Sequence, residues 1–274
     1  MRVADYRASV GLGFLLLLTS TVALGQNLSL TVFDSKTGQV LKGLTAQNFE
    51  VTDGKLLLTV QSAEYQEEPL DIMVVADASF LGEAIRPLLS PTIRRLPSGA
   101  QMALVTFDQA ATLVQDFTDS EERLLAGSEA LTYGNNPRAL DALYAAIDGG
   151  FSGSPGRRVV ILLSSGVEGQ GRTKLSEVIT LARQHDVAIF VAFADGTDSH
   201  LFQQLAGNTG GAWFHLKKLG LSPNASADLI YSAMAGSYLL DVTGVDQFGD
   251  RLKVKITGMP KSKMKIVVSI RPVD

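Results

Sequence analysis

The sequence predicts an α/β protein with a doubly wound, mostly parallel sheet, accompanied by a small β-sandwich that the N- and C-terminal strands form together. Between residues 69 and 236, short apolar runs alternate with segments of helical spacing, whereas residues 26–68 and 237–274 contain only alternating strands and turns. Alternation of strands with helices favours parallel pairing and helices on both faces of the sheet. Neither terminal segment could bury enough surface alone, so we expect the two to pack together.

The N-terminal segment has the alternation and punctuation of antiparallel strands. LSLTVFD (residues 28–34) alternates apolar with polar side chains, and Asp53-Gly54 separates two further apolar runs, which is typical of a hairpin. We expect a single helical turn over residues 45–49. After residue 236 the chain carries three more alternating strands, in SYLLDVTGV, DRLKVKITG and SKMKIVVSIRPV.

The middle segment begins with Leu70–Ala76, an apolar run that ends abruptly at Asp77 and reads as a strand buried on both faces. We expect a helix over Gly82–Leu96, broken or kinked by its two prolines, and Asn136 as the cap of a helix that starts at Pro137. The other predicted elements are hairpin strands 100–107 and 111–117, helices 120–131, 137–147, 174–185, 199–206 and 225–235, and strands 158–165, 188–195 and 211–216.

Residues 1–25 have the pattern of a signal peptide. Arg2 and Arg7 form a positive region, Val10–Leu18 an apolar region, and Ala23-Leu24-Gly25 a small-residue cleavage pattern before Gln26. The alternative is an uncleaved anchor, but the apolar core is short for a span, which takes about 20 residues. We therefore expect an exported protein, periplasmic or extracellular, with no stable membrane span after cleavage.

Composition excludes several classes of function. The net charge is −4 and charged residues form no long run, so the chain lacks the basic surface of a nucleic-acid-binding protein. The 274 residues contain no cysteine, which excludes disulfides, thiolate zinc sites and catalytic thiols. Three histidines, His185, His200 and His215, lie in different predicted elements without metal-ligand spacing, and no serine has an evident base. We therefore expect no enzymatic activity.

Several local sequences of the chain are distinctive in combination: DIMVVADAS, ALVTFD followed by LVQDFTD, LDALYAAID, RRVVILLSSG, and, in the flanking strands, GLTAQNFEVTDGK and SYLLDV. Together they resemble the von Willebrand factor A (VWFA) domain family over about Leu70–Gly236. The flanking strands resemble a bacterial branch of the family with β-extensions on both sides. The resemblance implies a binding or adhesion module whose partner is a protein.

The resemblance also implies a metal-ion-dependent adhesion site, which this chain carries in degenerate form. The family pattern is D-x-S-x-S after the first strand, a Thr that opens the LDALY helix and an Asp after the RRVVILL strand. Asp77 and Ser79 match, but Leu81, Pro137 and Ser165 stand where the second Ser, the Thr and the second Asp belong. Mg²⁺ takes about six hard oxygen ligands, so we expect no metal and no other cofactor at the vestigial Asp77 and Ser79. Asp77 is instead interpreted as a cap of the following helix.

We expect the partner to bind at the carboxyl edge of the sheet, on the loops 79–82, 133–137 and 165–173, because open α/β sheets place their sites there. The candidate binding residues share this edge and are Asp77, Ser79, Phe80, Leu81, Asn136, Pro137, Ser164, Ser165 and Glu168.

Two alternatives remain open. The first is metal-dependent adhesion through a rearranged Mg²⁺ site that uses Asp77, Ser79 and either Asp195 or Thr132. The second is a phosphate- or nucleotide-using enzyme built on Gly166–Thr173, which resembles a phosphate loop except that Arg172 replaces the lysine and Glu168 adds negative charge.

Overall fold

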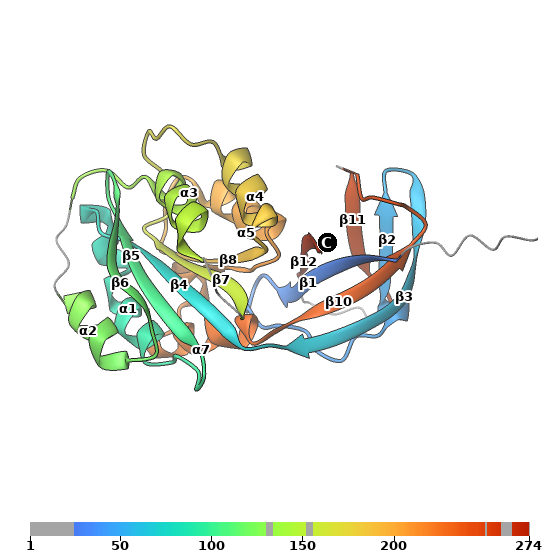
Figure 1. The fold of residues 1–274 in the computed structure, drawn as a ribbon, viewed down its shortest axis with the longest axis horizontal. Helices are drawn as coiled ribbons and strands as arrows, with labels where there is room; N and C mark the ends of the chain where they lie inside the picture. The colour runs from blue at the N-terminus through green and yellow to red at the C-terminus, as the bar shows by residue number, and fades with distance from the viewer. Residues whose placement is uncertain (1–24, 130–133, 152–155, 250, 259–264, 274) are drawn as a thin grey trace, which may run out of the picture.

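The computed structural model describes residues 25–129, 134–151, 156–249, 251–258 and 265–273, which form two sheets side by side along the long axis (Figure 1). Residues 1–24 of the predicted signal peptide lie outside the described residues, as do Thr132 and Tyr133. Within the described ranges, no helix combines the length and the apolar character needed to cross a membrane.

The first sheet has six strands in the order β6-β5-β4-β7-β8-β9. All neighbours are parallel except β5 and β6, which form the predicted antiparallel hairpin. Its strands are β4 (Leu70–Asp77), β5 (Gln101–Phe107), β6 (Ala111–Thr118), β7 (Arg157–Ser164), β8 (Val187–Phe193) and β9 (Trp213–His215). The doubly wound, mostly parallel sheet is thus confirmed.

Helices cover both faces of this sheet (Figure 1). Helices α1 (Arg86–Ile93), α2 (Glu121–Glu129) and α7 (Pro223–Met234) pack on one face, and α3 (Ala139–Gly150), α4 (Leu175–Gln184) and α5 (Ser199–Asn208) pack on the other. In β4, Ile72 and Val74 face the first group while Met73 and Val75 face the second, and all four are buried. This double burial explains why β4 is a continuous apolar run.

The helix between β4 and β5 is shorter and more interrupted than the sequence predicts. A 3-10 turn, η2 (Phe80–Ala84), precedes α1, which begins at Arg86 with Pro87 in its first turn and contains Pro91. Proline fits the first turn of a helix because its missing N–H would have no partner there. The predicted helix over 82–96 is therefore two elements, and the second ends at Ile93.

The terminal strands join into one antiparallel sheet, ordered β11-β2-β3-β10-β1-β12. They are β1 (Gln26–Asp34), β2 (Phe49–Asp53), β3 (Leu56–Glu67), β10 (Gly236–Thr243), β11 (Leu252–Ile256) and β12 (Ile266–Val273), and the expected turn is η1 (Ala46–Asn48). The sheet curls around its own core so that its end strands, β11 and β12, come into contact. The predicted association of N- and C-terminal strands is confirmed, in the form of a single curled sheet.

The outer face of β1 joins the two sheets. The ring of Phe33 meets that of Trp213 on β9 edge to face, 4.9 Å between centroids, and Thr31 Oγ1 donates to the Gly210 carbonyl at 2.6 Å. From β12, Arg271 forms an ion pair with Asp186. The edge strand β9 is thereby covered, and a groove that the short helix α6 (Leu216–Leu219) borders lies beside this junction.

Candidate functional site

The strand order of the parallel sheet reverses between β4 and β7, because the chain passes from β6 on one side to β7 on the other. The carboxyl ends of these two strands carry Asp77 and Ser164. Ligands of open α/β sheets bind in the crevice at such a reversal. The topology therefore brings the predicted residues to the edge where this fold places its sites.

Asp77 ties the two strand ends together. Its side chain is buried, Oδ1 accepts from Ser79 N at 2.9 Å, and Oδ2 accepts from Ser165 N at 3.0 Å. Gly82 lies so close that a Cβ there would come 2.1 Å from the Asp77 carbonyl oxygen. The expectation that Asp77 caps the following helix is wrong: the N-cap of η2 is Ser79, and its side chain makes no capping bond. The Asp77 carboxylate instead stabilises the turn that follows β4 and the end of β7.

Three serines at the same strand ends, Ser79, Ser164 and Ser165, are all buried. Ser164 Oγ accepts from Gly166 N at 3.0 Å and so holds the turn after β7. The Oγ atoms of Ser79 and Ser165 have no hydrogen-bond partner within the described part of the chain. Buried hydroxyls without a partner are costly, so these two are unsatisfied polar groups at this edge.

Glu168 reaches across to the N-terminus of α3, where its carboxylate oxygens accept from Ala139 N at 3.0 Å and Leu140 N at 3.2 Å. The expected cap, Asn136, does not perform this role: the N-cap of α3 is Arg138, with no capping side-chain bond. Burial, and to a smaller extent the charges of Asp141 and Asp198, raise the pKa of Glu168 to about 7 against the effect of the two N–H donors.

The rest of loop 166–173 is held by protein acceptors. Glu168 N donates to Asp198 Oδ2 at 3.0 Å, Gly169 N to the Pro137 carbonyl at 2.6 Å, and Thr173 N to Asp141 Oδ1 at 2.8 Å. Burial alone would raise the pKa of Asp141, but donation from Thr173 and Arg172 holds it below its usual value. Sequence reasoning missed Asp141 and Asp198 as site residues; the available signal was their position at the starts of helices.

Above this closed network, two apolar side chains of η2 are open to solvent: Phe80 is 63% exposed and Leu81 is 51% exposed. The turn is fixed because Phe80 N donates to the Gly134 carbonyl at 2.9 Å and Ser79 forms a bridge with Gly134. Of the nine candidate residues, these two are exposed, Asn136 and Glu168 are half-buried, and the rest are buried. All nine lie at the same edge.

Asp195 does not join Asp77. Its carboxylate, 48% exposed, accepts from Lys217 Nζ at 2.5 Å and lies 3.5 Å from His215 Nε2. Around Asp77 there remain one carboxylate, already bonded to two N–H groups, and two serine hydroxyls. Among the described residues, no three or more His, Asp or Glu side chains gather so as to hold a metal ion. This donor set does not fit a divalent cation that takes about six hard oxygens.

Comparison with solved structures finds the same fold in proximal thread matrix protein 1 from the mussel byssus. The TM-score is 0.52 at 18% identity, over 67% of this chain and 51% of that chain. A form of that protein with a zinc-occupied MIDAS motif gives a TM-score of 0.54 at 18% identity, over 67% and 50%. An aerotolerance-related membrane protein from Bacteroides fragilis aligns at 12% identity and a TM-score of 0.49, over 60% and 98%. At these identities the likeness concerns the fold alone.

No curated protein matches the chain. The family model described as von Willebrand factor type A domain does match, over residues 71–226, which is more than half of the chain. That range runs from β4 into α7 and contains the parallel sheet except Leu70, with the edge described above. The chain therefore belongs to the von Willebrand factor type A domain family.

Proposed function

We propose that this protein is an exported, non-enzymatic binding module that holds a protein partner on η2 and the adjoining loops without a metal ion. The observation that carries the proposal is the contrast at this edge. Phe80 and Leu81 are exposed, while the carboxylates of Asp77, Asp141 and Glu168 at the same edge accept backbone N–H groups of the protein itself. Exposed apolar side chains on a rigid base are typical of protein-binding surfaces.

The donor chemistry supports binding without metal. Leu81 and Pro137 offer no side-chain oxygen at two positions where the family pattern has hydroxyls, and Ser165 offers no charge where the pattern has Asp. The mussel protein with a zinc-occupied MIDAS motif represents the metal-bound condition of this fold. In the chain studied here, an apolar contact through Leu81 would replace the contact made through a metal.

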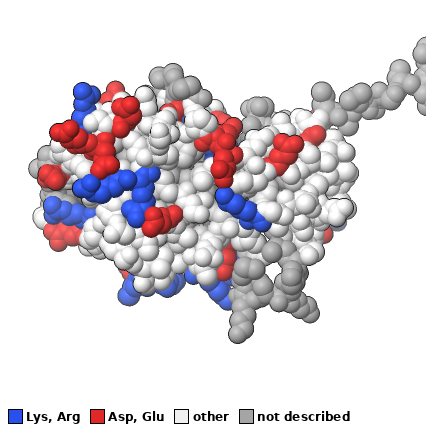
Figure 2. Space-filling model, turned by 90° about the horizontal axis from the view of Figure 1, so that it is seen from below, with Lys and Arg blue, Asp and Glu red and all other residues white. Residues whose placement is uncertain are grey.

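The same network argues against the phosphate-loop alternative. A phosphate would have to be bound by N–H groups of loop 166–173, but Glu168 N, Gly169 N and Thr173 N already donate to protein oxygens. Glu168 would add a like charge beside the phosphate. Figure 2 shows basic and acidic side chains interspersed on one face of the molecule. The net charge of −4 favours a protein partner over a nucleic acid.

The test immobilises residues 26–274 and captures proteins from the native periplasm or medium, with Mg²⁺ or with EDTA. We expect a captured partner whose amount does not change with EDTA and falls at least about tenfold in Phe80→Ser and Leu81→Ser, since exposed apolar anchors carry binding energy. Leu57→Ser and Leu113→Ser are matched controls, because these residues are 66% and 59% exposed elsewhere on the surface. Equal loss in the controls would contradict the proposed face.

Calorimetric titration with Mg²⁺ and Mn²⁺ separates the proposal from the metal-dependent alternative. We expect no binding in the micromolar range. Micromolar affinity that Asp77→Ala abolishes would overturn the metal-free proposal and favour a rearranged adhesion site.

A further inference from the structure

The edges of the two sheets differ in how they are covered. In the parallel sheet, β9 packs against β1 through Trp213 and Phe33, and in the terminal sheet the end strands β11 and β12 contact each other. The remaining edge is β6, the first strand of the parallel sheet (Figure 1). Within the described ranges, the elements that pack closely on β6 are its neighbour β5 and the helices α2 and α3, which lie over opposite faces of the sheet. The outer edge of β6 is therefore open to a further strand.

The two halves of this edge strand differ in their pairing. Residues 111–113 pair one to one with residues 105–107 of β5, whereas the register shifts after Leu113. Beyond the shift, Gln115 Nε2 donates to the Asp116 carbonyl at 2.9 Å, and Phe117 N donates to Asp116 Oδ1 at 2.7 Å. Bulges and charged side chains keep an edge strand from pairing with another chain. In β6 these features are confined to the second half.

The first half of β6 lacks this protection. Ala111, Thr112 and Leu113 are uncharged and exposed. In a regular antiparallel pair, every second residue directs both its N–H and its C=O away from the paired strand. Some backbone groups of residues 111–113 therefore point outward, where the backbone of an added strand can bond to them.

A pocket of about 270 Å³ lies beside this half of the strand, between β6 and the C-terminal part of α3. Ala111 and Leu113 line it from the strand, Ala145 and Gly149 line it from the helix, and every other lining residue is Gly, Ala, Val or Met. A Cβ added at Gly149 would have no neighbouring side chain or strand atom within 4 Å, so the pocket is open on that side. The space is smaller than the about 300–1,000 Å³ typical of small-molecule sites and suits one aliphatic side chain.

Leu113 of a second copy of the chain fits this pocket. The Leu113 side chain is 59% exposed, and together with Ala111 it lies on the side of the sheet that α3 covers. When two β6 strands pair antiparallel about Thr112, Leu113 of each copy lies opposite Ala111 of the other, because these residues flank the centre symmetrically. Ala111 is small, so the incoming Leu113 has room to reach Ala145 and Gly149. The same strand thus supplies both the projecting side chain and one wall of the pocket.

We propose that two copies of this chain associate through β6, so that the parallel sheet continues across a two-fold axis and each Leu113 enters the pocket of the other copy. A two-fold contact uses the same patch on both copies and therefore requires a self-complementary surface, which Leu113 and the pocket provide. The paired stretch is short, so we expect a weak dimer with a Kd of about 50–300 µM. Phe80 and Leu81 do not line this pocket, so this proposal and the proposed function can fail separately.

Sedimentation equilibrium of residues 26–274, which contain both sheets, measures the association between about 5 and 500 µM. Leu113→Ser should weaken the dimer at least about tenfold, because it removes the apolar side chain from both halves of the contact. Gly149→Leu fills the pocket and should weaken the dimer at least about fivefold, while leucine favours the helix more than glycine does and so preserves the fold. Leu57→Ser is the matched control, since Leu57 is 66% exposed on β3, and it should leave the association unchanged.

Amide hydrogen exchange locates the contact. We expect the outward-facing amides of residues 111–113 to exchange more slowly at 500 µM than at 5 µM protein, since only the dimer bonds them. Thermal unfolding of each variant confirms that it folds. A chain that stays monomeric up to about 500 µM, or a dimer that is equally strong in Leu113→Ser and Gly149→Leu, would overturn the proposal.

Discussion

Glu168 accepts hydrogen bonds from a helix that lies far from it in the sequence, so no local motif reveals this contact. It lies 29 residues beyond Ala139, yet its carboxylate accepts N–H groups at the N-terminus of α3. Two opposed effects act on it: burial and the neighbouring carboxylates favour the neutral acid, whereas the helix N–H groups favour the charged form. Burial prevails, and the pKa rises from 4.5 to about 7.

This shift predicts a specific dependence of stability on pH. Between pH 4.5 and 7 the folded protein keeps a proton that the unfolded chain releases, so the stabilisation is complete below 4.5 and is lost as the pH rises through 7. Glu168→Gln removes this titration. We expect the unfolding free energy of the wild type, relative to Glu168→Gln, to fall by about 1–3 kcal/mol from pH 5 to pH 8. Urea unfolding at four pH values measures it.

The control is Glu177→Gln, which changes an exposed carboxylate that accepts from Lys174 N at the start of α4. If the unfolding free energies of the wild type and of Glu168→Gln changed with pH by the same amount, burial of Glu168 would not govern its titration.

At the same scale, the location of Asp77 could be predicted from the sequence, and its bonds could not. A buried apolar run that stops at a carboxylate indicates a strand end, and the strand order then places that residue at the site. Its bond to Ser165 N joins residues 88 positions apart, so it depends on the register of β4 against β7. A helix cap is a local pattern, whereas only one of the two actual bonds, the one from Ser79 N, is local.

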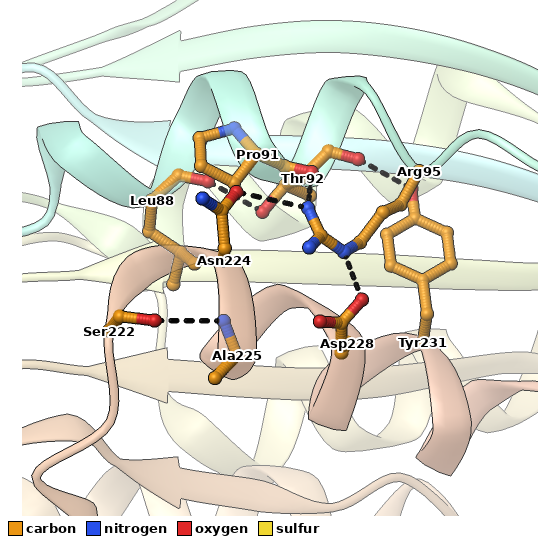
Figure 3. Close-up of polar contacts among 9 residues, drawn as sticks. All are labelled: Leu88, Pro91, Thr92, Arg95, Ser222, Asn224, Ala225, Asp228 and Tyr231. Carbon is orange, nitrogen blue, oxygen red and sulfur yellow. Dashed lines mark hydrogen bonds and ion pairs between the residues drawn. The ribbon is translucent and has the colours of Figure 1, made fainter.

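Among the elements, the contact of α1 with α7 shows how polar side chains complete a helix that prolines have shortened (Figure 3). Arg95 donates from Nη1 to the Pro91 carbonyl at 2.9 Å and from Nε to Asp228 Oδ1 at 2.5 Å. Tyr231 Oη donates to the Thr92 carbonyl at 2.9 Å. The Pro91 and Thr92 carbonyls at the end of α1 thus receive donors from side chains, and the Thr92 carbonyl also accepts from Arg95 N at 3.3 Å.

Tyr231→Phe removes one of these donors and leaves the ring in place. We expect a loss of about 1 kcal/mol in unfolding free energy, since the Thr92 carbonyl loses a buried partner. Tyr144→Phe is the control: Tyr144 lies on α3, is 38% exposed, and its replacement should change stability by less than about 0.5 kcal/mol. Chemical denaturation measures both, and an equal loss in the two variants would contradict this role of the hydroxyl.

The hydrophobic pattern predicted the positions of strands that are buried on both faces. It predicted less accurately where an element ends early or contains prolines. The strands β4, β7 and β8 were found because full burial makes them continuous apolar runs. The predicted strand over 211–216 is only β9, Trp213–His215, because α6 begins at Leu216. Four residues of helix carry too little periodic signal to be distinguished from a strand end.

For the whole molecule, the union of the terminal strands was predictable, because neither group could be stable alone. The side on which the curled sheet packs was not predictable, since it depends on single side chains of β1 that face outward. Phe33 belongs by sequence to the terminal sheet, yet it is fully buried in the core of the parallel unit. With the Thr31–Gly210 hydrogen bond and the Arg271–Asp186 ion pair, this ring links the two units.

Phe33→Ala should accordingly destabilise both units together. We expect a loss of about 3–5 kcal/mol, the usual cost of removing a buried phenylalanine ring. Trp213 fluorescence reports the junction and far-UV circular dichroism reports the whole chain, so urea unfolding followed by both signals measures the coupling. If the units unfold as one, the two transitions shift together, whereas Leu113→Ala on the exposed edge of β6 leaves both in place. A shift of the fluorescence transition alone would mean that the terminal sheet detaches before the parallel unit unfolds.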